Sequence, residues 1–317
     1  MRKKSPNLSQ LKTLYDQGKN IIDELKKQSP DSENTVDAIQ LSYDLQAGTY
    51  LQYRHDHLDS SERWSGAVAT QLDKLKLKNS QYNLLEVGVG EATTLASVVQ
   101  KLIKKPSRAL GFDISWSRLA VARHFITSLG VTVPIDLFMA DLFHIPLPDD
   151  SVDVVYTAHS LEPNGGKEIL ALRELYRVAR QYVVLLEPAY ELATSEGKAR
   201  MQKNGYIVGL QKAISQLEYE VVEHRLFDFS TNELNPTGLT VLKKQIPKTD
   251  SRQKRVKSPV LYCDPLSGEK LELLGGAYFS QKGLVTYPII GGIPCLVQKH
   301  AIITTQYSMW TRDIRTD

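Results

Sequence analysis

With 317 residues, this chain has room for one medium-sized domain with additions, and its 42% hydrophobic and 24% charged residues are typical of a soluble globular protein. The formal net charge of +3 neither requires nor excludes a polyanionic partner, and two cysteines are too few for a disulfide framework. No apolar run approaches the roughly 20 residues that span a bilayer, and the basic start lacks the apolar core of a secretory signal. We expect a cytoplasmic protein that does not insert into a membrane.

The first part of the chain, residues 1–78, is expected to be a helical extension that serves as a lid. Apolar residues recur near the 3.6-residue helical period over residues 8–25, and a second helix is expected over residues 36–53. A third helix begins near Asp59, in a cluster of capping residues, and buries Trp64.

Residues 79–245 alternate between strand-like and helix-like segments. We expect parallel strands at residues 84–88, 109–113, 136–140, 152–157 and 182–187, and helices at residues 91–104, 116–129 and 166–179. The strand-like segments 219–229 and 239–243 are separated by turn residues and are expected to pair antiparallel. The fold class is therefore α/β, with a seven-stranded, mostly parallel, doubly wound sheet.

The last part of the chain differs in composition. Residues 246–258 form a basic linker with almost no apolar residues. Residues 259–300 are rich in glycine, proline and short apolar runs, which predicts a small β module, and residues 301–317 follow as a tail.

One run of the sequence indicates a cofactor. An apolar strand that contains Glu86 leads into a turn with Gly88 and Gly90, and glycines there let a ligand approach the backbone. Twenty-three residues after Gly90, Asp113 ends the next strand, where a carboxylate usually binds ribose hydroxyls. Thr93 stands where a dinucleotide fingerprint has its third glycine, and no Walker phosphate loop is present. The pattern predicts a nucleoside-type cofactor; a strand–turn–helix without a ligand is the alternative.

The run from Glu86 to Ala92 resembles motif I of the class I S-adenosylmethionine-dependent methyltransferases, with Ala92 in place of a third glycine. Further segments agree with that family in chain order: Asp141 with the stretch 145–153, the end of the fourth strand at 158–160, the E-x-x-R-V helix at 174–178, and the fifth strand at 182–188. The turn at residues 179–181 departs from the family's usual L-K-P-G-G. The resemblance covers about residues 40–245 and implies the same α/β fold.

The resemblance also implies which residues surround S-adenosylmethionine. They are Glu86, Gly88, Gly90, Asp113, Ile114, Asp141 and Leu142. The glycines would admit the methionine part, and Glu86 would hold its amino group. Asp113 would accept hydrogen bonds from the ribose, and the last three would surround the adenine. The alternative for Asp113 and Asp141 is that they cap helices that follow the strands.

Methyl transfer needs a base only when the acceptor is a poorly ionised hydroxyl or a protonated amine. His159 and Glu162, after the fourth strand, are the catalytic candidates. The alternative for His159 is an imidazole that contacts the cofactor or is satisfied within the core. The alternative for Glu162 is that it orders a turn.

An N-terminal stretch with Tyr43 and Tyr50 resembles the Y-D-x-x-A-x-x-Y start of many small-molecule methyltransferases, in which this segment covers the cofactor. Both tyrosines fall on one helical face. The resemblance implies a lid and substrate-side role for them, and an aromatic stripe packed in the core is the alternative.

The C-terminal module resembles the small zinc-ribbon-like family that activates tRNA and translation-factor methyltransferases, through its Y-P-I-x-x-G-I-P stretch at residues 287–294. Cys263 matches the first zinc cysteine, but Leu266 replaces the second, and Cys295 lies away from the ligand positions. A tetrahedral zinc site needs four ligands, so no metal is expected. The module is expected to pack against the catalytic domain or to pair with a second subunit.

Three functions remain open from the sequence. The first is an S-adenosylmethionine-dependent methyltransferase that acts on oxygen or nitrogen of a small molecule, such as a sugar or a secondary metabolite. The second is an RNA or translation-protein methyltransferase, suggested by the module and the basic linker, with nucleic acid as the less favoured partner. The third is a catalytically silent binding partner, against which the intact glycine turn and Asp113 argue. A homodimer is also considered.

Overall fold

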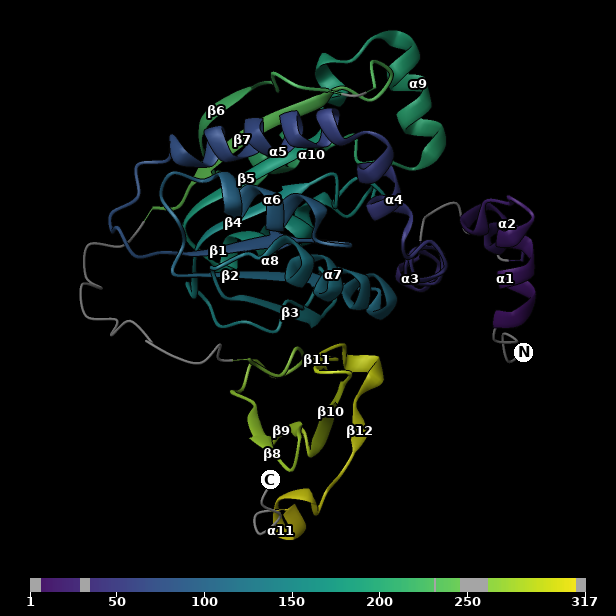
Figure 1. The fold of residues 1–317 in the computed structure, drawn as a ribbon, viewed down its shortest axis with the longest axis vertical. Helices are drawn as coiled ribbons and strands as arrows, with labels where there is room; N and C mark the ends of the chain where they lie inside the picture. The colour runs from purple at the N-terminus through teal and green to yellow at the C-terminus, as the bar shows by residue number, and fades with distance from the viewer. Residues whose placement is uncertain (1–6, 29–34, 231, 246–261, 312–317) are drawn as a thin grey trace.

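The computed structural model describes residues 7–28, 35–230, 232–245 and 262–311. Within them the chain forms a large sheet covered by helices and a smaller sheet near the C-terminus (Figure 1). The expected basic linker lies outside the described residues. In the ranges given above, no helix is both long and apolar enough to cross a membrane.

The helices that precede the large sheet are α1 (Leu8–Asp16), α2 (Ile21–Gln28), α3 (Val36–Leu45), α4 (Thr49–Asp56) and α5 (Leu58–Asp73). The first two helices expected from the sequence are each interrupted. A glycine with a left-handed backbone lies at each break: Gly18, with φ of 77°, and Gly48, with φ of 98°. The expected capping cluster near Asp59 is wrong, because α5 begins at Leu58 and its N-cap residue makes no side-chain cap hydrogen bond.

The strands of the large sheet are β1 (Asn83–Val87), β2 (Arg108–Asp113), β3 (Ile135–Met139), β4 (Val152–Ala158), β5 (Ala179–Pro188), β6 (Glu220–Leu226) and β7 (Thr237–Lys243). Their order is β3-β2-β1-β4-β5-β7-β6. The first five strands pair in parallel, and β7 runs antiparallel to both β5 and β6. The expected seven-stranded, mostly parallel sheet with a closing antiparallel pair is confirmed.

The helices that follow β1 are α6 (Thr93–Lys101), α7 (Trp116–Leu129), α8 (Glu168–Val178), α9 (Ser195–Asn204) and α10 (Leu210–Gln216). The bounds of α7 are those expected from the sequence. The helices α9 and α10 were not expected. α9 has only two buried residues, so its sequence carries little helical periodicity.

The sheet has a core on each face, because successive residues of a strand point to opposite sides. Leu84 packs with α5, α6 and α7 on one face, and Leu85 packs with α8 and α10 on the other. The strand β4 is buried along almost its whole length, as expected for a parallel strand that is covered on both faces. This confirms the doubly wound arrangement.

The order of the strands creates a switch point between β1 and β4. The chain moves from β1 outward to β2 and β3, then crosses back to β4 on the other side of β1. In such sheets a crevice forms at the carboxyl ends of the strands at this point, and ligands bind there.

The smaller sheet contains β8 (Glu272–Leu274), β9 (Ala277–Ser280), β10 (Val285–Ile290), β11 (Ile293–Pro294) and β12 (Ile302–Ile303), followed by α11 (Tyr307–Thr311). It docks on the free edge of the large sheet beside β3 (Figure 1). The amide of Leu296 donates to the carbonyl of Met139 at 2.8 Å, and the amide of Cys263 donates to the carbonyl of Pro146 at 3.0 Å. The module therefore packs against the strand that leads into Asp141. Cys263 and Cys295 are both buried and free.

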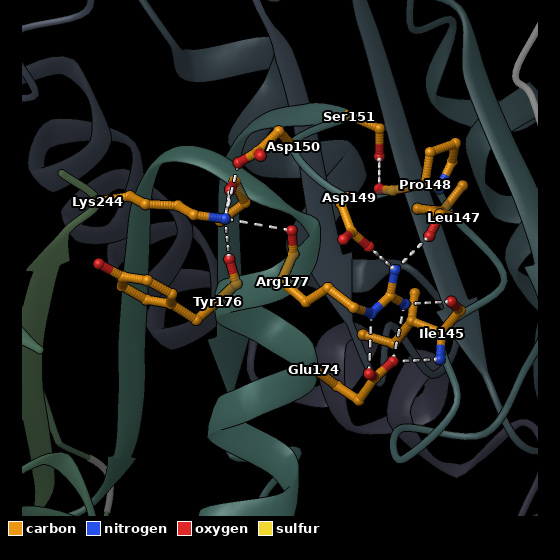
Figure 2. A network of polar contacts seen from close by, with 11 residues as sticks. Ile145, Leu147, Pro148, Asp149, Asp150, Ser151, Glu174, Tyr176, Arg177 and Lys244 are labelled. Carbon is orange, nitrogen blue, oxygen red and sulfur yellow. Dashed lines mark hydrogen bonds and ion pairs between the residues drawn. The ribbon is translucent and has the colours of Figure 1, made fainter. Parts of the chain in front are cut away.

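A polar network fixes the end of α8 to the loop between β3 and β4 (Figure 2). Arg177 donates to the carbonyls of Ile145 and Leu147 at 2.7 and 2.8 Å. Its guanidinium also pairs with Glu174 and Asp149, each at 2.8 Å. Glu174 and Arg177 are the acidic and the basic residue of the E-x-x-R-V stretch. This stretch therefore orders the loop that leads from β3 to β4.

Candidate functional site

A cavity of about 360 Å³ opens at the carboxyl ends of β1, β2 and β4, at the switch point of the sheet. Residues of α3, α4 and α5 form its outer wall. Its lining includes these residues named from the sequence: Tyr43, Tyr50, Gly88, Gly90, Asp113, Ile114, Asp141, Leu142 and His159. Glu86 and Glu162 are not part of the lining.

The turn after β1 requires its glycines. Gly88 has φ of 65°, and a Cβ there would lie 2.4 Å from the Cβ of Ser160, which is closer than atoms can approach. Gly90 has φ of 54° and lies under the ring of Tyr50. A Cβ on Gly90 would lie 3.4 Å from the Cδ2 atom of that ring. The missing side chains leave the backbone of the turn exposed to the cavity.

Asp113 ties this turn to the start of α7. Its carboxylate accepts hydrogen bonds from the amides of Gly90 and Ser115, each at 2.9 Å. Burial raises the pKa of Asp113, and the charge of Arg118 together with these amides partly offsets that effect. A carboxylate has about four acceptor positions, so Asp113 retains acceptor capacity toward the cavity.

The helix-capping alternative does not describe either aspartate. The N-cap of α7 is Ser115, whose hydroxyl accepts from the amide of Arg118. The next element after β3 is β4, with no helix in the described residues 140–151 between them, and Asp141 instead accepts from the amide of Phe143 at 3.0 Å within a turn.

Glu86 is buried between the strands, away from the cavity. Its carboxyl accepts a hydrogen bond from the hydroxyl of Tyr156 on β4 at 2.5 Å. Burial raises the pKa of Glu86 to about 8, although the hydrogen bond from Tyr156 acts in the opposite direction. The strand alternation turns Glu86 to the same face as Leu84, so the structure does not bring it to the position that the resemblance implied.

His159 lies at the end of β4 with a left-handed backbone, φ of 58°. Its Nδ1 is 2.8 Å from a carboxylate oxygen of Glu162, and its Nε2 is 2.7 Å from the hydroxyl of Thr237. Burial alone would lower the pKa of His159, but the hydrogen bond and charge of Glu162 outweigh it, and the pKa is raised. Burial likewise acts to raise the pKa of Glu162, and the bond from His159 lowers it overall.

The buried carboxylate of Glu187 holds the backbone of the turn that follows β4. Glu187, at the end of β5, accepts hydrogen bonds from the amides of Ser160 and Leu161, each at 3.1 Å. Burial raises the pKa of Glu187 to about 7, and the nearby charge of His159 lowers it in part. Glu187 therefore fixes the two residues that follow the left-handed His159.

Several residues of this site were not assigned to it from the sequence. Trp64 was expected only as a buried helix residue, yet it lines the cavity, with its ring centre 6.1 Å from that of His159. Thr237 carries no local signal, because the antiparallel pairing of β7 with β5 is what brings it to the site. Arg118 is 1% exposed and lies over the rings of Tyr43 and Tyr50, 4.7 and 4.1 Å from their centres.

The end of α3 is fastened over the cavity by the buried Arg118 and the half-buried Asp44. Arg118 donates from Nε to the carbonyl of Tyr43 at 3.0 Å. Asp44 accepts from the hydroxyls of Ser115 and Ser117 at the start of α7, each at 2.9 Å. The tyrosines therefore lie in a covering segment of the cavity and do not form a stripe within the main core.

The arrangement combines a backbone surface for a ligand, a buried acceptor carboxylate and an imidazole held by a second carboxylate. The orientation of the His159 ring is fixed from both sides, by Glu162 at Nδ1 and by Thr237 at Nε2. Among the described residues, no group of three or more His, Cys, Asp and Glu side chains is placed to hold a metal ion.

Comparisons with known proteins show similarity over part of this chain. Residues 84–182 match a family model described as a methyltransferase domain. The ajmaline N-methyltransferase of Rauvolfia serpentina is 27% identical over 124 residues, which are 38% of this chain and 41% of that protein. The chain thus spans about two fifths of the length of this curated relative.

Some solved structures are similar to part of this chain, at low sequence identity. A S-adenosylmethionine-dependent methyltransferase from Aquifex aeolicus is 20% identical, with a TM-score of 0.40 over 55% of this chain and 87% of that one. The [4+2]-cyclase SpnF is 14% identical, with a TM-score of 0.47 over 57% of this chain and 81% of that one.

Proposed function

We propose that this chain, whose residues 84–182 match a family model described as a methyltransferase domain, transfers the methyl group of S-adenosylmethionine to oxygen or nitrogen of a small molecule. The observation that carries the proposal is that Asp113 binds the amide of Gly90 at 2.9 Å and lines the cavity at the switch point. An acceptor carboxylate and an open glycine turn at that point suit a nucleoside with an amino acid attached.

In this proposal each lining residue has one task. When bound, the cofactor supplies an activated methyl group on its sulfonium. Asp113 accepts hydrogen bonds from the ribose, and its charge strengthens them. Ile114 packs on the adenine, whose edge Asp141 and the backbone at Leu142 bind. Gly88 and Gly90 admit the methionine part, and Glu86 supports β1 through Tyr156 instead of holding the amino group.

His159 is the proposed general base. With Nδ1–H donating to Glu162, Nε2 is left as the acceptor, and it accepts from the hydroxyl of Thr237, which also lines the cavity. The acceptor hydroxyl or ammonium gives its proton to the Thr237 oxygen, Thr237 passes its own hydroxyl proton to Nε2, and Glu162 stabilises the imidazolium that forms. Because only the neutral ring can act as a base, activity should rise with pH through the raised pKa of His159.

The remaining lining residues of the cavity support a small-molecule acceptor. Among them Tyr53, Trp64 and Phe143 supply rings, and Ser60 and Ser61 supply hydroxyls. A site of this size with mostly apolar walls, several aromatic rings and a few polar groups is typical of small-molecule sites. The acceptor is therefore expected to combine an apolar face with the hydroxyl or amine that is methylated.

A labelled-methyl screen tests the proposal. The chain is incubated with S-adenosylmethionine that carries a radioactive methyl group and with separate pools of small metabolites, RNA and protein. Label should enter the metabolite pool, and the variants Asp113→Ala and His159→Ala should lose this transfer. Label in RNA or protein alone would contradict the small-molecule acceptor, and no label in any pool together with no cofactor binding would contradict the activity itself.

A further inference from the structure

Glu91 is a completely buried carboxylate that the methyl-transfer site does not use directly. One of its oxygens accepts from the amides of Gly48 and Tyr50 at 2.9 and 3.3 Å, and the other accepts from the amide of Leu51 at 2.6 Å. Gly48 is the N-cap residue of α4 and has no side chain to cap the helix, and Tyr50 and Leu51 lie in the first turn of α4. Glu91 therefore caps this helix from 40 or more positions away in the chain.

Gly90 and Glu91 are adjacent residues that contact Asp113 and the start of α4, respectively. Glu91 follows Gly90, whose amide donates to Asp113. The ring of Tyr50, at the start of α4, covers Gly90, and the guanidinium of Arg118 lies 4.1 Å above the centre of that ring. A change in the hold of Glu91 on α4 would thus move the ring that closes the Gly90 side of the cavity.

We propose that Glu91 is a positioning residue for the cofactor: it holds the start of α4, and with it Tyr50, over the glycine turn. The inference rests on the proposed function, because the site that Tyr50 covers is the cofactor site. If only the docked form of α4 completes that site, the apparent dissociation constant equals the intrinsic one divided by the docked fraction. By the same linkage, the bound cofactor should protect the α4 amides that Glu91 holds.

The variant Glu91→Gln tests this hold without changing the volume of the side chain. One amide-accepting oxygen becomes an NH₂ group, which faces a backbone N–H and cannot accept from it. The matched control is Glu168→Gln. Glu168 is also buried and accepts from the amides of Val208 and Gly209 at the start of α10, each at 3.2 Å, but it does not line the cavity.

Two readouts are used, and neither depends on methyl transfer. In calorimetric titration, Glu91→Gln should bind S-adenosylhomocysteine about tenfold more weakly than the wild type, the effect of losing one charge-assisted hydrogen bond. Glu168→Gln should bind it as the wild type does. In hydrogen exchange, peptides over residues 46–54 of Glu91→Gln should exchange faster, and saturating S-adenosylhomocysteine should slow them again, while β4 keeps its wild-type protection.

Tyr50→Ala keeps the inference testable if the buried variant Glu91→Gln does not fold, because Tyr50 is 47% exposed. It should weaken binding by itself, and Glu91→Gln should add little in the Tyr50→Ala background, since both act through one contact. Wild-type affinity in Glu91→Gln, or in Tyr50→Ala if Glu91→Gln does not fold, overturns this inference alone. Unchanged exchange over residues 46–54 in Glu91→Gln also overturns it. A wild-type chain that binds no S-adenosylhomocysteine overturns the proposed function and this inference together.

Discussion

The substitution Gly88→Ala is expected to damage both the fold and the cofactor site. Gly88 has φ of 65°, and the left-handed region costs a residue with a side chain about 1–2 kcal/mol. The new Cβ would also lie 2.4 Å from the Cβ of Ser160, and relieving such overpacking costs about 1–3 kcal/mol more. The free energy of unfolding should therefore fall by about 2–5 kcal/mol.

Urea denaturation measures this loss, and two further variants divide it into its parts. Gly130 has nearly the same φ, 63°, but no atom lies within 4 Å of the place its Cβ would take. Gly130→Ala should thus show only the backbone cost of about 1–2 kcal/mol. Adding Ser160→Gly to Gly88→Ala should recover the steric part. Equal losses for Gly88→Ala and Gly130→Ala, or no recovery in the double variant, would refute the close contact at the base of the cavity.

Further predictions concern the charged groups of the site and its support. Glu162→Gln should lower the pKa of His159, because the Glu162 carboxylate raises that pKa against the effect of burial. The acid limb of the kcat/KM profile should move to lower pH, and kcat should fall about tenfold or more. An acid limb that does not move would argue against His159 as the base. Glu187 has a pKa of about 7 in the folded protein against an ordinary value of 4.5. Between these pH values the folded state keeps a proton on Glu187 that the unfolded state releases. The wild type should therefore lose roughly 3 kcal/mol of stability, relative to Glu187→Gln, as pH rises from about 4.5 to about 7. If urea denaturation gave the same difference in free energy of unfolding between the wild type and Glu187→Gln at about pH 5 and at about pH 8, this prediction would be contradicted. Arg177→Met should lower the free energy of unfolding by about 3 kcal/mol through the lost bonds to the β3–β4 loop, and a loss no larger than that of an exposed surface arginine such as Arg63→Met would show that the network is unimportant.

The sequence predicted the sheet well, because its strands are buried apolar runs bounded by turn residues. The bounds of α7 also follow from the sequence, since Ser115 caps its start and Gly130, with a left-handed backbone, ends it. The break between α3 and α4 was missed. Gly48 lies inside a continuous helical pattern, and the pattern does not show that its backbone turns left-handed there.

For the site, the residues on the carboxyl ends of strands were predictable, and the long-range partners were not. Gly88, Gly90 and Asp113 are set by motif and spacing. Glu91 and Thr237 act through residues about 40 and 78 positions away, so only the tertiary fold reveals what they do. Glu86 was misplaced for a simpler reason: motif position suggested the cavity, while strand alternation turns its side chain toward Tyr156.

Calorimetric titration of the chain with S-adenosylhomocysteine tests the central claim most directly. The account predicts one binding site per chain, and at least about tenfold weaker binding by Asp113→Ala, which removes the acceptor of the ribose hydroxyls. Asp153→Asn is the control, because Asp153 is a buried acid that accepts from the amide of Asn83 at the opposite end of the sheet, and it should bind as the wild type does. No binding by the wild type, or equal binding by Asp113→Ala, would contradict the claim.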